Sequence, residues 1–255
     1  MSKLKALVCG ASQGIGEAVA KNLASAGVQV IALARSQDKL ERLISGLPGE
    51  GHKAIVQDVG DLPGLKTQVH RLITDVGPVQ ILVNNSGGPK AGPLLEAEDA
   101  EFLKGFSEHV LVSHNLAKLL VPGMKAQNFG RIINIISTSV KVPIPNLGVS
   151  NTIRAAMGSW AKTLSQELAP YGITVNNVLP GYTLTPRFEA LRKATSERLK
   201  ISEAEVEKLW KAQTPSGRFC TPEEVASAIG FLASGSAESI TGINLPVDGG
   251  RTQTL

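Results

Sequence analysis

Close to its start the chain reads Cys9-Gly10-Ala11-Ser12-Gln13-Gly14-Ile15-Gly16, directly after an apolar run and directly before a stretch of helical period. Glycines let the backbone turn tightly and approach a bound group, and the free N–H groups at the start of a helix favour negative charge. A glycine-rich turn is convincing evidence only when it joins a strand to a helix in this way. The sequence therefore predicts that this turn binds the pyrophosphate of a dinucleotide.

Short apolar runs alternate with longer helical segments along the rest of the chain. This alternation indicates strand, helix, strand units that stack into one parallel sheet covered by helices on both faces. The expected strands are Leu4 to Cys9, Gln29 to Ala34, His52 to Gln57, Ile81 to Asn84, Arg131 to Ile136, Thr174 to Leu179 and Asn244 to Val247. The expected helical stretches include Glu17 to Ala26, Gly64 to Asp75, Asp99 to Leu120, Ile153 to Ala169 and Pro222 to Ala233. The predicted fold is a single α/β domain over residues 1–255, of the doubly wound Rossmann type.

The composition narrows the class of protein. The chain has 255 residues, of which 42% are hydrophobic, enough to bury a core around one large sheet. Lys and Arg total 26 against 22 Asp and Glu, and this small excess is spread along the chain, so we expect no nucleic-acid partner. Cys9 and Cys220 have neither metal-ligand nor disulfide spacing, and no apolar stretch approaches the roughly 18 residues that span a bilayer. We expect a cytoplasmic protein without a secretory leader, a metal site or membrane contact.

The residue after the second expected strand bears on the choice of cofactor. An acidic residue about 20 positions after the glycines would bind the ribose 2′-hydroxyl of NAD, but the chain has Arg35 there, followed by Ser36. A guanidinium suits a 2′-phosphate and offers nothing to a ribose diol, so NADP(H) is favoured over NAD(H). Gln13 stands where a second cation would strengthen this preference. The alternative is that Arg35 is an exposed arginine that merely begins a loop.

Seven ordered blocks of sequence resemble the short-chain dehydrogenase/reductase family. They are the glycine turn, Asp58-Val59, Asn84-Asn85-Ser86-Gly87, Gly130 to Ser137, Pro180-Gly181 with Thr185, Ile240-Thr241-Gly242 and Val247-Asp248-Gly249-Gly250. The resemblance implies a seven-stranded doubly wound sheet, a homo-oligomer (tetramer or dimer), and hydride transfer between a nicotinamide and a carbonyl or alcohol. It also implies cofactor contacts beyond the turn and Arg35-Ser36, at Asp58, Val59, Asn85, Gly87, Arg154, Pro180, Gly181, Thr183 and Thr185.

The catalytic residues that the resemblance implies are altered in this chain. The family normally uses an Asn, a Ser, and a Tyr followed four residues later by Lys, and these positions hold His109, Ser137, Ser150 and Arg154. An aliphatic hydroxyl is a far weaker acid than a phenol, so Ser150 donates a hydrogen bond but does not readily give up its proton at neutral pH. Arg154 keeps a positive charge that can hold ribose hydroxyls, but a guanidinium does not titrate. The predicted catalytic set is therefore atypical, with only Ser137 retained.

The source of the reaction's proton is open in such a set. One hypothesis is a relay from His109, since an ordinary histidine pKa of about 6.5 suits proton exchange at pH 7, through water to a carbonyl held by Ser137 and Ser150. His109 would share its helical face with Phe102, Phe106, Ser113 and Leu116. The alternative is that His109 is a satisfied core or interface histidine. One tyrosine, Tyr182, is expected near the site, and we expect it to line the substrate pocket.

The segment from Thr183 to Arg218 interrupts the alternation of strands and helices, because it is charged, helical in pattern and free of strands. An insertion of this length in a compact domain commonly forms a lid, so we expect a helical substrate lid over residues 183–218. The alternative is an ordinary pair of solvated helices. Its basic residues suit an anionic substrate or carrier and equally a solvated helix face; they are Arg187, Arg192, Lys193, Arg198 and Lys200.

Two functions from different classes agree with these features. The first is an NADP(H)-dependent oxidoreductase, similar to 3-oxoacyl-(acyl-carrier-protein) reductases, that acts on a small carbonyl or alcohol substrate or on an acyl thioester. The second is a weakly active or inactive NADP(H)-binding homologue that acts as a sensor or scaffold. The loss of Tyr and Lys favours the second, whereas the intact Ser137 and the lid favour the first. Lyase or isomerase chemistry on the same fold stays open, because a fold does not determine a function.

Overall fold

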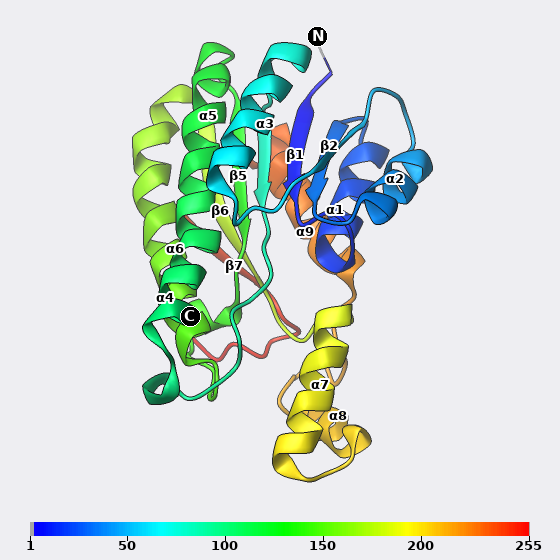
Figure 1. The fold of residues 1–255 in the computed structure, drawn as a ribbon, viewed down its shortest axis with the longest axis vertical. Coiled ribbons are helices and arrows are strands. Elements are labelled where there is room, and N and C mark those ends of the chain that lie inside the picture. Colours follow the sequence, from blue (N-terminus) through cyan, green and yellow to red (C-terminus); the bar gives the residue numbers. More distant parts are fainter. Residues whose placement is uncertain (1–2, 255) are drawn as a thin grey trace.

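Seven parallel strands form one sheet in the order β3-β2-β1-β4-β5-β6-β7. The computed structural model describes residues 3–254. Its strands are β1 (Lys5–Cys9), β2 (Gln29–Ala34), β3 (Lys53–Val56), β4 (Ile81–Asn84), β5 (Gly130–Ile135), β6 (Ile173–Pro180) and β7 (Asn244–Val247). The predicted doubly wound parallel sheet is confirmed (Figure 1), and β2, β4 and β7 have the expected bounds.

The helices follow the expected alternation. They are α1 (Gly14–Ser25), α2 (Gln37–Gly46), α3 (Leu62–Val76), α4 (Asp99–Phe106), α5 (Val112–Ala126), α6 (Gly148–Leu168), α7 (Pro186–Leu199), α8 (Glu203–Ala212) and α9 (Pro222–Ala233). Helix α9 has the predicted bounds and begins at a capping box, in which the Thr221 hydroxyl accepts from the Glu224 N–H. Helix α1 begins at Gly14 rather than at Glu17, because the glycine turn itself supplies its first residues. Helix α2 was not among the expected stretches.

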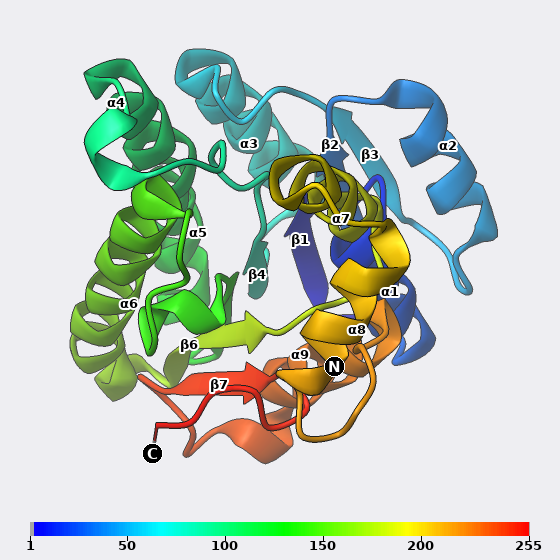
Figure 2. The same cartoon turned by 90° about the horizontal axis from the view of Figure 1, so that it is seen from below.

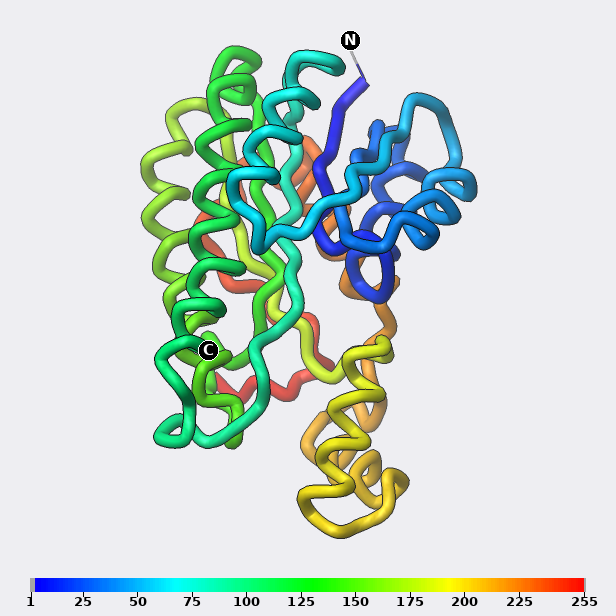
Figure 3. The backbone as a smooth tube through the Cα atoms, in the orientation of Figure 1, coloured from blue at the N-terminus to red at the C-terminus, as the bar shows by residue number. Residues whose placement is uncertain are grey.

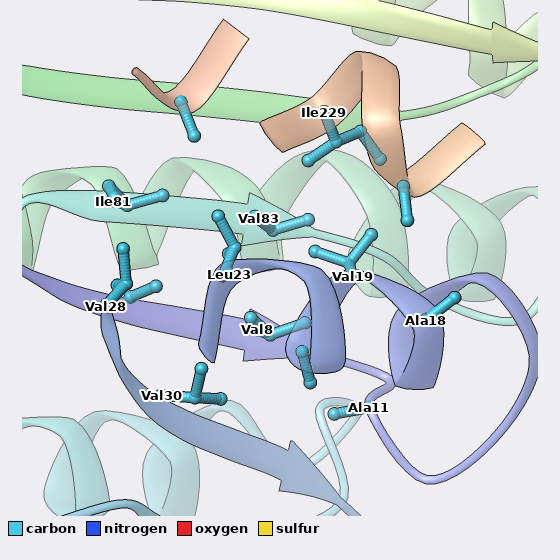
Figure 4. Packing of buried hydrophobic residues seen from close by; sticks show 14 of the residues in the cluster. Val8, Ala11, Ala18, Val19, Leu23, Val28, Val30, Ile81, Val83 and Ile229 are labelled. Atoms are coloured by element: carbon cyan, nitrogen blue, oxygen red, sulfur yellow. The ribbon is translucent and has the colours of Figure 1, made fainter. Parts of the chain in front are cut away.

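Helices cover both faces of the sheet because strand side chains alternate between two apolar clusters. One cluster joins the sheet to α1, α2 and α9, and Figure 4 shows part of it, with Val19 and Leu23 of α1 packed close to Val8 and Val83 of the strands. The other joins the opposite face to α3, α5 and α6. Cys9 is buried at the end of β1, as its apolar context predicts. Within residues 3–254, no helix is both long and apolar enough to cross a membrane.

A π-helical turn, Ser107–Leu111, separates α4 from α5, where one continuous helix was expected. The wider turn adds a residue, so the buried face of α4 moves by one position to Gly105, which packs against Ile153 of α6. His109 stays buried, but Phe106 is 42% exposed. The expectation that Phe106 shares the buried face of His109 is therefore wrong.

The segment that follows β6 forms a separate helical pair. In Figure 1, α7 and α8 stand together, apart from the helices that cover the sheet, and the view from below in Figure 2 also shows them side by side. They share their own apolar cluster, whose buried members are Phe188, Val206, Trp210 and Phe219. The trace in Figure 3 shows a second long connection, from β4 to α4, descending past the same end of the sheet. Both segments therefore lie where β4 and β6 end.

Candidate active site

The site lies where the order of the strands reverses. The chain places β2 and β3 on one side of β1, and β4 to β7 on the other. In open α/β sheets, ligands bind outside the carboxyl ends of the strands at such a point. A pocket is found there, between the ends of β1, β4 and β5 and the π turn. Its lining includes Cys9, Val59, Asn84, Asn85, Ser86, Glu108, His109, Asn134, Ile136 and Arg154.

The glycine turn forms an open cradle beside this pocket. Gly10 and Gly14 have φ of +62° and +58°, a region that favours glycine. A Cβ atom on Gly16 would clash with the Gly10 carbonyl oxygen, to which Asn85 Nδ2 donates at 3.4 Å. Gln13 occupies the N-cap of α1 without a side-chain capping bond, so its side chain does not satisfy the free N–H groups at the positive end of this helix. The cradle therefore suits an anionic group.

Two cations lie at the rim of this cradle. Arg35 follows β2 and forms an exposed ion pair with Asp58, with Nη1 and Oδ2 3.8 Å apart. Lys39 of α2 donates to Gln13 Oε1 at 2.7 Å. Sequence reasoning missed Lys39, because its approach to Gln13 depends on how α2 packs beside the turn. Lys39 thus places a cation beside Gln13, the position at which the sequence itself has none.

Of the four predicted catalytic residues, His109 and Arg154 line the pocket. Ser150 and Arg154 lie one turn apart on α6, and Arg154 Nη1 donates to the carbonyl oxygen of Ile135 at 3.0 Å, which ties α6 to the end of β5. Ser137 directly follows Ile136, a lining residue, and its hydroxyl accepts from the Ser139 N–H at 3.1 Å. The structure thus brings His109 and Arg154 together at the pocket, whereas Ser137 and Ser150 are not among the residues that line it.

His109 is 4% exposed and is held by a residue that sequence reasoning did not assign. Its Nδ1 lies in a hydrogen bond of 2.7 Å with Ser86 Oγ, and in the described chain its Nε2 has no partner. Burial, and next the charge of Arg154, lower the pKa of His109 to about 3. The expected pKa near 6.5 is therefore not kept, and the ring is neutral at pH 7. The sequence signal was Ser86 itself, which replaces the Ala of the family's Asn-Asn-Ala-Gly turn.

Arg154 is a buried cation with one nitrogen unsatisfied. It is 7% exposed, and within residues 3–254 its Nε has no hydrogen-bond partner. Burial, and then the charge of Arg187, lower the pKa of Arg154 to about 10. The guanidinium therefore stays charged at neutral pH, and it presents that charge to the pocket.

A ladder of asparagine side chains connects the pocket to the rest of the sheet. Asn84 Nδ2 donates to Asn134, Asn134 Nδ2 to Asn177, and Asn177 Nδ2 to Asn244, each at 2.8 Å, across the neighbouring strands β4 to β7. At the pocket end, Asn84 Oδ1 is buried and finds no donor among the described residues. The ladder thus fixes the ends of four strands and leaves one acceptor at the site.

The remaining predicted cofactor residues lie on the connections around the site. The Gly181 N–H donates to Val247 O at 2.9 Å, and Thr183 Oγ1 donates to Gly181 O at 3.1 Å. Thr185 caps α7, and its methyl group would be 3.2 Å from a Cβ on Gly14, so the start of α7 lies over the glycine turn. The others have no side-chain bond that assigns a role: Ser12 and Gly87 in connections, Ile15 in the first turn of α1, Ser36 at the N-cap of α2 and Pro180 at the end of β6.

Two side chains near the site are unsuited to acid, base or nucleophile chemistry. Tyr182 is not among the residues that line this pocket, and it stacks on Trp210 with ring centroids 4.5 Å apart. Its hydroxyl accepts from Arg251 Nη2 at 3.2 Å, and burial raises the pKa of Tyr182. Cys9 does line the pocket, but burial raises the pKa of its thiol to about 12, so it stays protonated.

Comparison with known proteins agrees with this geometry. Residues 10–252 match a family model described as enoyl-(acyl carrier protein) reductase. The chain is 34% identical, over 96% of each protein, to the 3-oxoacyl-[acyl-carrier-protein] reductase FabG of Haemophilus influenzae. Its structure is similar to that of YwfH, an NADPH-dependent reductase involved in bacilysin biosynthesis, with a TM-score of 0.95, 28% identity and full coverage of both chains.

A structure with bound ligands is also similar. The L-sorbose reductase of Gluconobacter frateurii, solved with NADPH and L-sorbose, matches with a TM-score of 0.91 and 30% identity, over 100% of this chain and 98% of the other. The glycine turn, the strand order and the sequence matches therefore all indicate the same family. The chain belongs to the short-chain dehydrogenase/reductase family.

Proposed function

We propose that this chain is an NADP(H)-dependent oxidoreductase that interconverts a carbonyl and an alcohol, with an atypical set of His109, Ser137, Ser150 and Arg154. The observation that carries the proposal is the burial of Arg154 and His109 in one pocket beside the glycine turn. The reductases with similar structures, which are described as NADPH-dependent or were solved with NADPH, support the choice of cofactor.

The residues around the glycine turn fit NADP(H). The turn offers uncapped N–H groups at the start of α1 to a pyrophosphate, and no side chain can occupy the place of Gly16. Arg35 and Lys39 provide charge for a 2′-phosphate. Arg154 lies at the pocket, where it can hold ribose hydroxyls. When bound, NADP(H) supplies or accepts a hydride at its nicotinamide.

The chain's own residues then orient the substrate oxygen and deliver a proton. The hydroxyls of Ser137 and Ser150 hold the oxygen, and the positive charge of Arg154 stabilises the negative charge that develops on it during reduction. Because His109 is neutral, it acts without forming an imidazolium beforehand: Nε2–H gives a proton toward the oxygen through water as Nδ1 takes one from Ser86, and the Ser86 hydroxyl takes one from solvent in the same step, so that no serine alkoxide forms. Ser86 is partly exposed, so its hydroxyl can be reprotonated from solvent.

We also propose that residues 183–218 act as the substrate lid, since Thr185 places the start of α7 over the glycine turn. The proposed homo-oligomer has support in exposed apolar side chains on one tract of α4 and the π turn, where Leu103 is 73% exposed and Leu111 38%. A second copy covering this tract would make the mass in solution a multiple of 26.8 kDa, which light scattering measures.

A second candidate, an NADP(H)-binding sensor or scaffold, is favoured by one observation: neither Ser150 nor Arg154 releases a proton at neutral pH. Both candidates bind NADPH, but only the oxidoreductase oxidises it with a substrate. NADPH binding is measured by fluorescence, and oxidation of NADPH is then followed against ketones, quinones and 3-oxoacyl thioesters. Turnover supports the oxidoreductase. Tight binding without turnover across this panel supports the sensor, and absence of NADPH binding contradicts both.

A further inference from the structure

Two arginines converge on the same point next to the pocket. Arg154 comes from α6, and Arg187 comes from the first turn of α7. Their terminal Nη2 atoms lie 3.8 Å and 3.6 Å from the position that a Cβ atom of Gly88 would occupy. Because residue 88 is a glycine, it places no side chain between the two guanidinium groups.

The first of these cations is buried without a counter-ion. No carboxylate of residues 3–254 lies within ion-pair distance of Arg154, and its Nε is unpaired. Glu108, which lines the same pocket, pairs with Lys104 at 3.8 Å instead. Burying a charge costs free energy unless it is paired. A protein that keeps such a charge at its site can recover that cost when an anionic ligand binds.

The second cation, Arg187, lacks the acidic partners that two other arginines of the same segment have. Arg192 is surrounded by Glu189, Glu203 and Glu207, and Arg218 pairs with Glu224. Arg187, in contrast, has no acidic partner in the described chain, and its Nη2 donates to the Pro89 carbonyl oxygen at 3.2 Å.

This bond places the charge of Arg187 over the connection between β4 and α4. Its proximity to Arg154 is unfavourable as long as nothing negative lies between them.

We propose that Arg154 and Arg187 together bind a carboxylate group of the substrate, so that the substrate is a small oxo acid or hydroxy acid. The inference rests on the proposed oxidoreductase function and specifies its substrate class. Paired guanidinium groups suit a carboxylate, which accepts hydrogen bonds at both oxygens. The proposed function assigns the phosphates of the cofactor to other groups of this chain, namely the start of α1 and the cations Arg35 and Lys39.

The test uses acids and their neutral analogues on the NADPH-loaded protein. Pyruvate, acetoacetate and levulinate are each compared with their methyl ester, by thermal unfolding and by NADPH oxidation. We expect at least one acid to protect the wild type more than its ester, with at least tenfold tighter binding. Arg187→Gln lowers the acid's affinity tenfold or more and the ester's less than twofold. Arg198→Gln, which removes an exposed charge from the same helix, changes neither.

Each other outcome contradicts the carboxylate site. If no acid protects the wild type more than its ester, the site does not select a carboxylate. If Arg187→Gln weakens NADPH and leaves the ratio of acid to ester unchanged, the anion held is a phosphate of the cofactor. Failure of the proposed function is seen separately, as absence of NADPH binding to the wild type, and thermal protection by the acids is then still measured on the protein alone.

Discussion

Ser86 Oγ and His109 Nδ1 lie 2.7 Å apart, so a serine from the end of β4 holds the one buried histidine that lines the pocket. The hydroxyl keeps the imidazole in one orientation, with Nε2 unpaired among residues 3–254. Burial together with the charge of Arg154 makes protonation of this ring unfavourable. His109 thus behaves as a neutral hydrogen-bonding group, and this has consequences for how the protein responds to acid.

The stability of the fold should fall on mild acidification because of His109. Its pKa is lowered to about 3 in the folded protein, whereas an unfolded histidine titrates near 6.5, so between these values the unfolded chain binds more protons. The contribution is fully present above pH 6.5 and is lost as the pH falls toward 3. Between pH 7.5 and pH 5 the loss is about 2 kcal/mol. Urea unfolding at both pH values measures it.

The variant His109→Asn tests this prediction, because Asn does not titrate and is the residue that the family usually has at this position. We expect the change in unfolding free energy between the two pH values to be smaller in this variant by about 2 kcal/mol. His70→Asn on the exposed face of α3 is the control and keeps the wild-type difference. Equal pH dependence in all three proteins would show that His109 titrates normally.

Loss of Arg35 should reduce NADPH affinity without a matching loss for NADH. A charge-assisted hydrogen bond contributes about 1.5–3 kcal/mol, so Arg35→Ala should weaken NADPH binding about tenfold to hundredfold. Lys39→Ala should have a smaller effect in the same direction, because its ammonium is shared with Gln13. Fluorescence titration with both cofactors measures the affinities. Arg42→Ala, an exposed residue of α2, is the control, and equal losses for NADPH and NADH would argue against a 2′-phosphate contact.

Local patterns predicted the sheet well because each strand carries its own signal. The apolar runs Gln29–Ala34, Ile81–Asn84 and Asn244–Val247 are strands with the expected bounds. The first two are buried on both faces, and doubly covered strands are apolar on both faces. The start of α9 was also predicted, from the local chemistry of a threonine cap followed by Pro222.

Features that depend on tertiary packing could not be predicted in this way. The π turn changes the hydrogen bonding from one helical period to another without a distinct residue pattern, and so Phe106 was placed on the wrong face. Lys39 beside Gln13, and Arg187 opposite Arg154, come from elements distant in the chain. The site residues at the strand ends could therefore be predicted from the sequence. The charged side chains that converge on the site from distant elements could not.

Gly16 should tolerate no side chain. In Gly16→Ala the added methyl group meets the backbone of Gly10, which cannot move away without opening the turn. We expect a loss of about 1–3 kcal/mol in unfolding free energy and at least a hundredfold loss of NADPH affinity. Gly46→Ala, at the last residue of α2 with no atom near the new Cβ, should change neither. NADPH affinity of Gly16→Ala within threefold of the wild type would contradict the role of the turn.

The asparagine ladder should stabilise the fold more at its centre than at its end. Asn134→Ala removes two hydrogen bonds and leaves the amide of Asn84 and the carbonyl oxygen of Asn177 buried without partners. Unpaired buried groups cost about 1–3 kcal/mol each, so we expect a loss of about 2–6 kcal/mol for the two groups. Asn244→Ala removes one bond at a partly buried site and should cost less. Denaturant unfolding of both variants measures the difference, and equal losses would contradict the ladder.

Restoring the usual acid should raise turnover. In Ser150→Tyr with Arg154→Lys, a phenol and a neighbouring ammonium lie one turn apart on α6, and the ammonium lowers the phenol's pKa from its ordinary value near 10. A positioned general acid contributes about 100- to 10,000-fold, so we expect NADPH oxidation with a ketone to rise by at least 100-fold. The matched control, Ser150→Phe with Arg154→Lys, keeps the ring and the cation but lacks the hydroxyl, and should not rise. Equal rates in the two double variants would mean that proton donation does not limit the reaction on this fold.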